Sequence, residues 1–126
     1  MSNTLETMTT EEMLRANGGV KMKLTQYGYA GDPYTDSYTR AGKGAYRDLD
    51  RDSIALTDSG LAILGLTKSQ VRKNDVWLNI DTGKGGGVLQ RRVDDRAPQK
   101  DYRADLYMPR GFDHSLPDYA DVTVRR

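Results

Sequence analysis

The amino-acid sequence predicts a small all-β protein that closes into a barrel. The chain has 126 residues, of which only 37% are hydrophobic and 13 are glycine, a composition typical of a small, turn-rich domain. Its acidic residues are 15 aspartates and only 3 glutamates, and aspartate favours turns and the ends of strands. About six short apolar segments are separated by turn signals, and this spacing favours a barrel over a sandwich.

The predicted strands are short apolar runs bounded by turn residues. Residues 21–27 alternate polar and apolar side chains, as expected of a strand with one buried face. Further strands are predicted at 53–57, 75–80, 88–93 and 120–125, with a short strand or a turn at 102–107. Residues 61–66 fit either a strand or the start of a helix, and Thr67 is expected to cap a single helical turn. Trp77, in mid-strand, is expected in the core.

Two parts of the chain are distinguished by composition. Residues 1–20 are predicted to form an N-terminal arm, and residues 21–126 form the barrel domain. Thr9 and Glu12 have the spacing of a capping box, which indicates a short helix in the arm, with a disordered leader as the alternative. The polar, Tyr- and Gly-rich stretch 28–52 is long for a loop, which makes it a candidate functional surface.

Composition also excludes several classes of function. The chain has no cysteine and a single histidine, His114, which we expect at the surface, so a multi-histidine zinc site is excluded and no metal or cofactor is expected. The net charge of +1, with acids and bases interleaved, argues against nucleic acid as a partner. No stretch approaches the roughly 20 apolar residues that span a bilayer. The glycine-rich run 83–87 lacks the spacing of a phosphate loop and predicts a hairpin connection.

Localisation is left open by the sequence. The first ten residues are polar and have no apolar signal-peptide core. Either the protein is not exported by that route, which fits the cytoplasm or a virion, or a leader has been removed, which fits the cell envelope or the extracellular space. Oligomeric state is not indicated by any pattern in the chain.

The most informative motif is a pair of acids followed by a turn and a third acid. The run Val-Asp-Asp-Arg-Ala-Pro at 93–98 predicts a strand that ends in acids before a proline turn. Asp105 follows in an apolar setting. Two carboxylates brought close by a turn are the minimum apparatus for acid and base catalysis on a glycosidic bond. The alternative is structural: Asp95 caps the turn or pairs with Arg103, and Asp105 accepts backbone amides.

In their order along the chain, these motifs resemble a known barrel family. Ala-Leu-Thr at 55–57 is followed by Val-Trp-Leu-Asn-Ile at 76–80, a glycine hairpin, the acidic run at 93–98 and Arg-Ala-Asp-Leu at 103–106. This order is similar to that in the double-psi β-barrels of rare lipoprotein A, the expansins and the barwin-like proteins. It is also similar to the related three-aspartate domain of membrane-bound lytic transglycosylase A. The resemblance covers roughly residues 24–126.

The resemblance implies a six-stranded double-psi β-barrel with an open groove and activity on β-1,4 glycans, notably peptidoglycan. It implies a lytic transglycosylase-like reaction, in which one acid protonates the glycosidic oxygen and the sugar's own hydroxymethyl group then gives an anhydro end. Asp95 matches the catalytic acid, Asp105 matches the second aspartate, and Asp52 lies where rare lipoprotein A carries another acid.

The chain departs from the family pattern at three places. The family's usual Pro-Leu-Gly-Thr turn before the central strand is replaced by Arg-Lys-Asn-Asp at 72–75. Leu49 and Gly60 stand where rare lipoprotein A carries a glutamate and a histidine. These departures favour an alternative function, a non-catalytic module that binds peptidoglycan or another polysaccharide. A third reading is a structural or interaction protein of a phage or secretion particle, in which the barrel is only a scaffold.

Aromatic and basic residues are the expected sugar-binding groups. Aromatic rings pack against the C–H faces of sugars, and a tyrosine adds a hydroxyl group for hydrogen bonding. Because the long polar stretch is otherwise poor in apolar anchors, its tyrosines are predicted to form sugar subsites, with half-exposed packing as the alternative. Two arginines beside the acids complete the predicted set of substrate-binding residues: Tyr27, Tyr29, Tyr34, Tyr38, Arg96 and Arg103.

Overall fold

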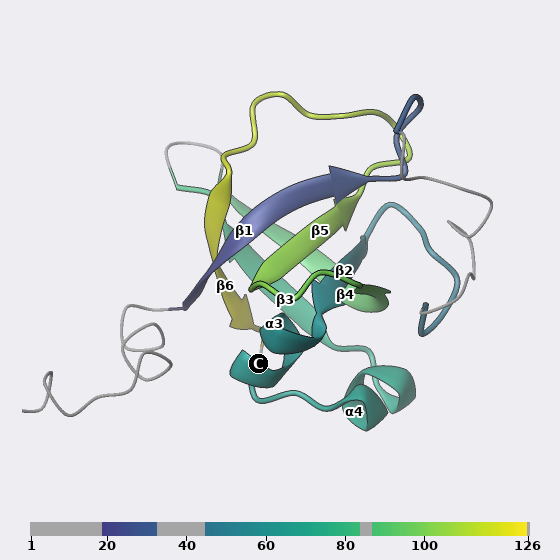
Figure 1. Cartoon of the computed structure of the whole chain (residues 1–126), viewed down its shortest axis with the longest axis vertical. Helices are drawn as coiled ribbons and strands as arrows, with labels where there is room; N and C mark the ends of the chain where they lie inside the picture. The colour runs from purple at the N-terminus through teal and green to yellow at the C-terminus, as the bar shows by residue number, and fades with distance from the viewer. Residues whose placement is uncertain (1–18, 33–44, 84–86, 126) are drawn as a thin grey trace, which may run out of the picture.

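A computed structural model describes residues 19–32, 45–83 and 87–125, and in these residues six strands close into a barrel (Figure 1). The strands are β1 (Val20–Tyr27), β2 (Ser53–Thr57), β3 (Trp77–Asp81), β4 (Val88–Ala97), β5 (Arg103–Tyr107) and β6 (Tyr119–Val124). The predicted all-β barrel is therefore confirmed. The predicted arm lies outside the described residues except for its last two, and Val20 already begins β1.

The order of strands around the barrel is β1-β5-β2-β4-β3-β6. The pairs β1/β5 and β2/β4 are parallel, and the other four pairs are antiparallel. In this ring every strand of the first half, β1 to β3, is bonded only to strands of the second half, β4 to β6. Exchanging β1 with β4, β2 with β5 and β3 with β6 reproduces the same ring, so the connectivity has a pseudo-two-fold symmetry. The two halves of the chain are therefore interlocked around the ring.

The core lies inside the ring, where alternate residues of each strand point. On β3, Leu78 and Ile80 are buried in the core, so Trp77 faces the outside of the barrel. The prediction that Trp77 lies in the core is wrong, and its ring instead lies 5.4 Å from the guanidinium carbon of Arg92. The fully buried side chains with the largest volumes include Met22, Ile54, Leu56, Ile63, Leu78, Ile80 and Leu106.

Two short helices join β2 to β3. The first, α3 (Asp58–Ile63), begins at the Thr57 cap, whose hydroxyl accepts the amide of Gly60 at 3.1 Å. The second, α4 (Lys68–Lys73), begins at Thr67, and Thr67 and Gln70 form a reciprocal capping box, so the predicted cap is confirmed. Residues 61–66 were predicted as a strand or as the start of a helix, and the structure instead has residues 61–63 as the end of α3. No helix in the described part of the chain is long and apolar enough to cross a membrane.

The acidic run lies inside β4, and not in a turn that follows it. The strand was predicted at 88–93, but it continues to Ala97, and Pro98 comes only after its end. The β2/β4 ladder pairs Ile54 with Val93 and then Ala55 with Asp95, so Asp94 is an extra residue at a β-bulge. A bulge lets an added residue stay in the strand and re-aims the side chains around it. Two consecutive aspartates therefore reach different surroundings.

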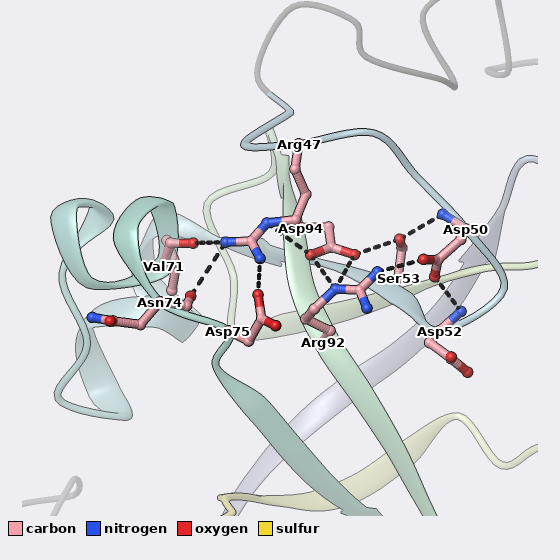
Figure 2. Close-up of polar contacts among 9 residues, drawn as sticks. All are labelled: Arg47, Asp50, Asp52, Ser53, Val71, Asn74, Asp75, Arg92 and Asp94. Carbon is pink, nitrogen blue, oxygen red and sulfur yellow. Dashed lines mark hydrogen bonds and ion pairs between the residues drawn. The ribbon is translucent and has the colours of Figure 1, made fainter.

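Asp94 is the centre of a buried ionic network (Figure 2). Its side chain is 0% exposed. The Arg92 Nε donates to both carboxylate oxygens, at 2.9 and 3.0 Å, and the Ser53 hydroxyl donates to Oδ2 at 2.6 Å. The Nε of Arg47 lies 3.2 Å from Oδ1. The Arg92 guanidinium also donates to Asp50 Oδ2 at 2.5 Å. The two guanidinium groups beside Asp94 provide the partners that a buried carboxylate needs.

Arg47 connects this network to the end of α4. Its Nη2 donates to the carbonyl oxygens of Val71, at 2.5 Å, and Asn74, at 3.2 Å, and its Nη1 pairs with Asp75 (Figure 2). The Arg47 amide also donates to the Asp94 carbonyl oxygen, at 3.3 Å. One guanidinium thus joins the segment before β2, the bulge of β4 and the carbonyl groups at a helix end, which are otherwise unsatisfied.

Asp94→Ala is expected to lower the free energy of unfolding by about 2–4 kcal/mol, because it removes the buried carboxylate that accepts from Arg92 and the Ser53 hydroxyl and that forms an ion pair with Arg47. Urea unfolding followed by circular dichroism measures this loss. The matched control is Asp101→Ala, which removes an exposed carboxylate paired with Arg103 and should cost at most about 1 kcal/mol. Equal losses in the two variants would contradict a structural role for Asp94.

Candidate functional site

The candidate site is built on a row of residues that crosses four strands. Ala55 on β2 pairs with Asp95 on β4 on one side and with Asp105 on β5 on the other. Asp105 in turn pairs with Thr25 on β1. Because neighbouring strands lie about 4.8 Å apart, the Cα atoms of the two aspartates are separated by roughly 10 Å, with Ala55 between them.

These side chains point to the outside of the barrel. On β5 the flanking residues Ala104 and Leu106 are buried in the core, so Asp105 faces outward. Directly paired residues of neighbouring strands share a face, which places Ala55 and Asp95 beside it. Ala55 is only 2% exposed although it faces outward, so the surrounding side chains cover it.

Asp95 is half-buried and accepts two hydrogen bonds. The Tyr27 hydroxyl donates to Oδ2 at 2.8 Å, and the Arg96 amide donates to Oδ1 at 2.7 Å. Burial raises the pKa of the Asp95 carboxyl, and the negative charge of Asp94 adds to this, while the two donors oppose it. The alternative in which Asp95 pairs with Arg103 is not what the structure has, since Arg103 pairs with Asp101.

Asp105 is the more strongly perturbed of the two acids. Burial raises its pKa from the ordinary 3.8 to about 7. The Thr25 hydroxyl, which donates to Oδ1 at 3.0 Å, and the charge of Arg103 oppose this rise, while the nearby carboxylates of Asp32 and Asp95 reinforce it. A side-chain hydroxyl, and not a set of backbone amides, is thus its donor. A carboxyl with such a pKa can give or take a proton near neutral pH.

Tyr27 and Tyr107 form the aromatic side of the site. Burial and the neighbouring charge of Asp95 raise the pKa of the Tyr27 phenol, so it stays protonated and acts as a donor. The rings of Tyr27 and Tyr107 lie 5.4 Å apart. Gly28 follows Tyr27 with φ +80°, and its amide donates to Asp32 Oδ2 at 2.9 Å. A Cβ at Gly28 would lie 2.3 Å from Cε1 of Tyr107, so the ring depends on a glycine there.

The predicted substrate-binding arginines are held at the surface by other aspartates. Arg96 is exposed and makes a bidentate pair with Asp58, at 2.8 and 2.7 Å. Arg103 pairs with Asp101 in the same way, at 3.1 and 2.8 Å. Bidentate pairs of this kind fix the planar guanidinium group.

Asp52 is placed with the Asp94 network and not with the acid pair. It precedes Ala55 by three residues, about 10 Å along a strand. Its amide donates to Asp50 Oδ1 at 2.8 Å and its carbonyl accepts the amide of Arg92 at 2.7 Å. Figure 2 shows its carboxylate turned away from Asp94.

The remaining predicted tyrosines differ in outcome. Tyr34 and Tyr38 lie outside the described residues. Tyr29 is half-buried, and its ring lies 5.1 Å from that of Phe112. Sequence reasoning missed Thr25 and Tyr107, which reach Asp105 and Tyr27 only through the parallel β1/β5 pairing. The alternation of polar and apolar residues in the two strands could have placed both side chains on the outer face. The sequence had no signal for the pairing of the two strands.

Comparisons of the chain with protein-family models, with curated proteins and with solved structures found no match. The similarity to the double-psi family therefore depends on the sequence motifs described above. Among the residues that the structure describes, no group of three or more histidine, cysteine, aspartate or glutamate side chains is arranged to hold a metal ion.

The raised pKa of Asp105 has a consequence for stability. Since the folded chain keeps this proton up to about pH 7 while the unfolded chain loses it near 3.8, stability should fall as pH rises between these values and then level off. Asp105→Asn should remove this part of the decline. Urea midpoints measured across the range, together with the ¹³C titration of the carboxyl group, test the prediction. A titration midpoint near 4, as in an exposed aspartate, would contradict it.

Gly28→Ala is expected to destabilise the fold and displace Tyr107, because the added methyl meets the ring and the positive φ is strained. A loss of about 1–3 kcal/mol in unfolding free energy is expected. Gly31→Ala is the matched control: Gly31 has φ +88° but nothing within 4 Å of its Cβ position, so it has the strain without the clash. Equal losses for the two variants would show that the Tyr107 contact is unimportant.

Proposed function

We propose that this chain is a glycan-active domain that cleaves a β-1,4 glycosidic bond, with peptidoglycan as the substrate class. The observation that supports the proposal is the pair of outward carboxyl groups, Asp95 and Asp105, on either side of Ala55. Glycoside cleavage needs one carboxyl group that brings a proton and one that stays ionised. The sequence similarity to lytic transglycosylases and rare lipoprotein A supports peptidoglycan as the substrate.

The surroundings of the two acids favour different roles. Sequence reasoning assigned the acid to Asp95, but Asp105 has the larger rise in pKa and a single hydroxyl donor. Asp95 accepts a phenol and a backbone amide, and both stabilise its ionised form. In the proposed mechanism Asp105 is therefore the proton donor and Asp95 is the carboxylate.

The proposed reaction is an intramolecular transfer. The Asp105 proton passes to the glycosidic oxygen as its bond to the anomeric carbon breaks. The hydroxyl of the sugar's own hydroxymethyl group then attacks the anomeric carbon, and its proton passes to the Asp95 carboxylate. The products are a strand with a new free hydroxyl and a strand with a 1,6-anhydro end. Exchange with solvent returns the two carboxyl groups to their starting states.

A second candidate function is glycan binding without cleavage. Leu49 and Gly60 stand where rare lipoprotein A carries a glutamate and a histidine. The hydrogen bonds that Asp95 and Asp105 accept inside the fold are also compatible with purely structural carboxyl groups. Binding without cleavage would identify this function, and the absence of both would leave the scaffold reading.

Incubation with purified peptidoglycan sacculi tests the proposal. We expect anhydro-muropeptides, detected by mass spectrometry, and a loss of activity on the order of 10²-fold or more in both Asp105→Asn and Asp95→Asn. Asp121→Asn is the matched control, since it changes an exposed carboxylate on β6, a strand that pairs with neither β4 nor β5, and it should retain activity. Circular dichroism establishes that each variant is folded.

Each outcome separates the candidates. Full activity in either site variant would exclude that carboxyl group from the chemistry. Products that carry a reducing end would show hydrolysis by water in place of the intramolecular transfer. Sacculi that pull down the chain but release no products would select the binding module.

A further inference from the structure

A cluster of three aromatic rings lies at the end of the barrel where β1 and β5 finish. The Phe112 ring lies 5.1 Å from the Tyr29 ring, nearly perpendicular to it, and 4.7 Å from the His114 ring. Phe112 is 44% exposed, and His114 is exposed too. Figure 1 shows the long β5–β6 connection, which holds Phe112 and His114, starting beside the end of β1. Large apolar rings exposed together mark a binding surface more often than scattered ones do.

The connection that carries Phe112 is held in place by β1. The Gln26 side chain accepts the Asp113 amide at 2.7 Å and donates to the Asp113 carbonyl at 2.8 Å. The Met108 amide donates to the Tyr27 carbonyl at 2.8 Å. The Asp113 carboxylate is occupied by the amide and hydroxyl of Ser115, at 2.9 and 2.6 Å. The backbone that carries the exposed ring is thus held in place before any ligand arrives, which lowers the entropic cost of binding.

Ring contacts and the backbone at Gly28 connect the cluster to the acid pair. Tyr27 donates to Asp95, and its ring lies 5.4 Å from that of Tyr107. Tyr107 packs closely over the backbone of Gly28. The residue after Gly28 is Tyr29, whose ring meets Phe112. The cluster is therefore continuous with the site on its β1 side.

We infer that Tyr29, Phe112 and His114 form a sugar subsite for a glycan polymer whose scissile bond lies at Asp95 and Asp105. This inference rests on the proposed function and adds that the substrate is a long chain. The rings offer apolar faces to the C–H faces of a pyranose. The carboxylate of Asp113, between Phe112 and His114, is bonded to the amide and hydroxyl of Ser115 and does not point at the rings as a free charge. We therefore expect a long strand to occupy both the acid pair and the cluster, and a disaccharide to occupy the acid pair alone.

Peptide-free glycan strands, sorted by length, test the subsite. Affinities are measured by calorimetry in an Asp105→Asn background, so that no strand is cleaved. We expect long strands to bind more tightly than a disaccharide, and Phe112→Ala to weaken long-strand binding about five- to tenfold while leaving disaccharide binding unchanged. Tyr119→Ala is the matched control: it removes a ring that is 54% exposed on β6 and should change neither affinity.

The two proposals fail in different ways. If the unmodified chain releases anhydro-muropeptides from sacculi but long-strand affinity is the same with and without Phe112, the subsite is wrong and the proposed function stands. An equal affinity for long and short strands overturns the subsite in the same way. If the chain neither cleaves sacculi nor binds any strand, the proposed function is wrong and the subsite falls with it.

Discussion

The insertion of β2 between β4 and β5 is the constraint on which the site depends. Asp95 and Asp105 lie on β4 and β5, which follow each other in the sequence but do not pair with each other. The two acids lie on the same face of the sheet only because each pairs with Ala55 on β2. Since every ladder in the ring joins one half of the chain to the other, neither half can form this sheet alone. The site is therefore complete only when the whole barrel is folded, and its formation requires contacts between residues distant in sequence.

The bulge at Asp94 places two neighbouring acids in different surroundings. In a regular strand, consecutive side chains point to opposite faces, and one acid of the pair would be forced into the core. The extra residue lets Asp94 enter a pocket of two arginines and a serine, while Asp95 stays in register with Ala55. The buried network thus fixes the backbone from which Asp95 projects. Asp94, which stabilises the fold, and Asp95, which belongs to the site, are neighbours in the sequence.

Local patterns predicted much of this fold, and non-local pairing accounts for what they missed. The alternation in 21–27 identified β1, and Thr67 with Gln70 identified the start of α4, because both signals lie within a few residues. The end of β4 was misplaced because a bulge has no local signature that distinguishes it from a turn. Trp77 was misplaced because Val76, Trp77 and Leu78 are all apolar, which leaves the phase of the alternation open. Both acids of the site and Tyr27 were found, but Thr25 and Tyr107 were missed because their places beside Asp105 and Tyr27 depend on the order of the strands.

The surface ion pairs explain why two carboxyl groups beside arginines have raised pKa values. Arg96 adjoins Asp95 in sequence and Arg103 lies two residues from Asp105, and a direct pair with either would lower the pKa of that acid. Instead Asp58 holds Arg96 and Asp101 holds Arg103, each through two hydrogen bonds. Arg103 then lowers the Asp105 pKa only by its more distant charge, and burial outweighs it. The two outer aspartates thus let desolvation dominate at the acids, which is the condition that proton transfer near neutral pH requires.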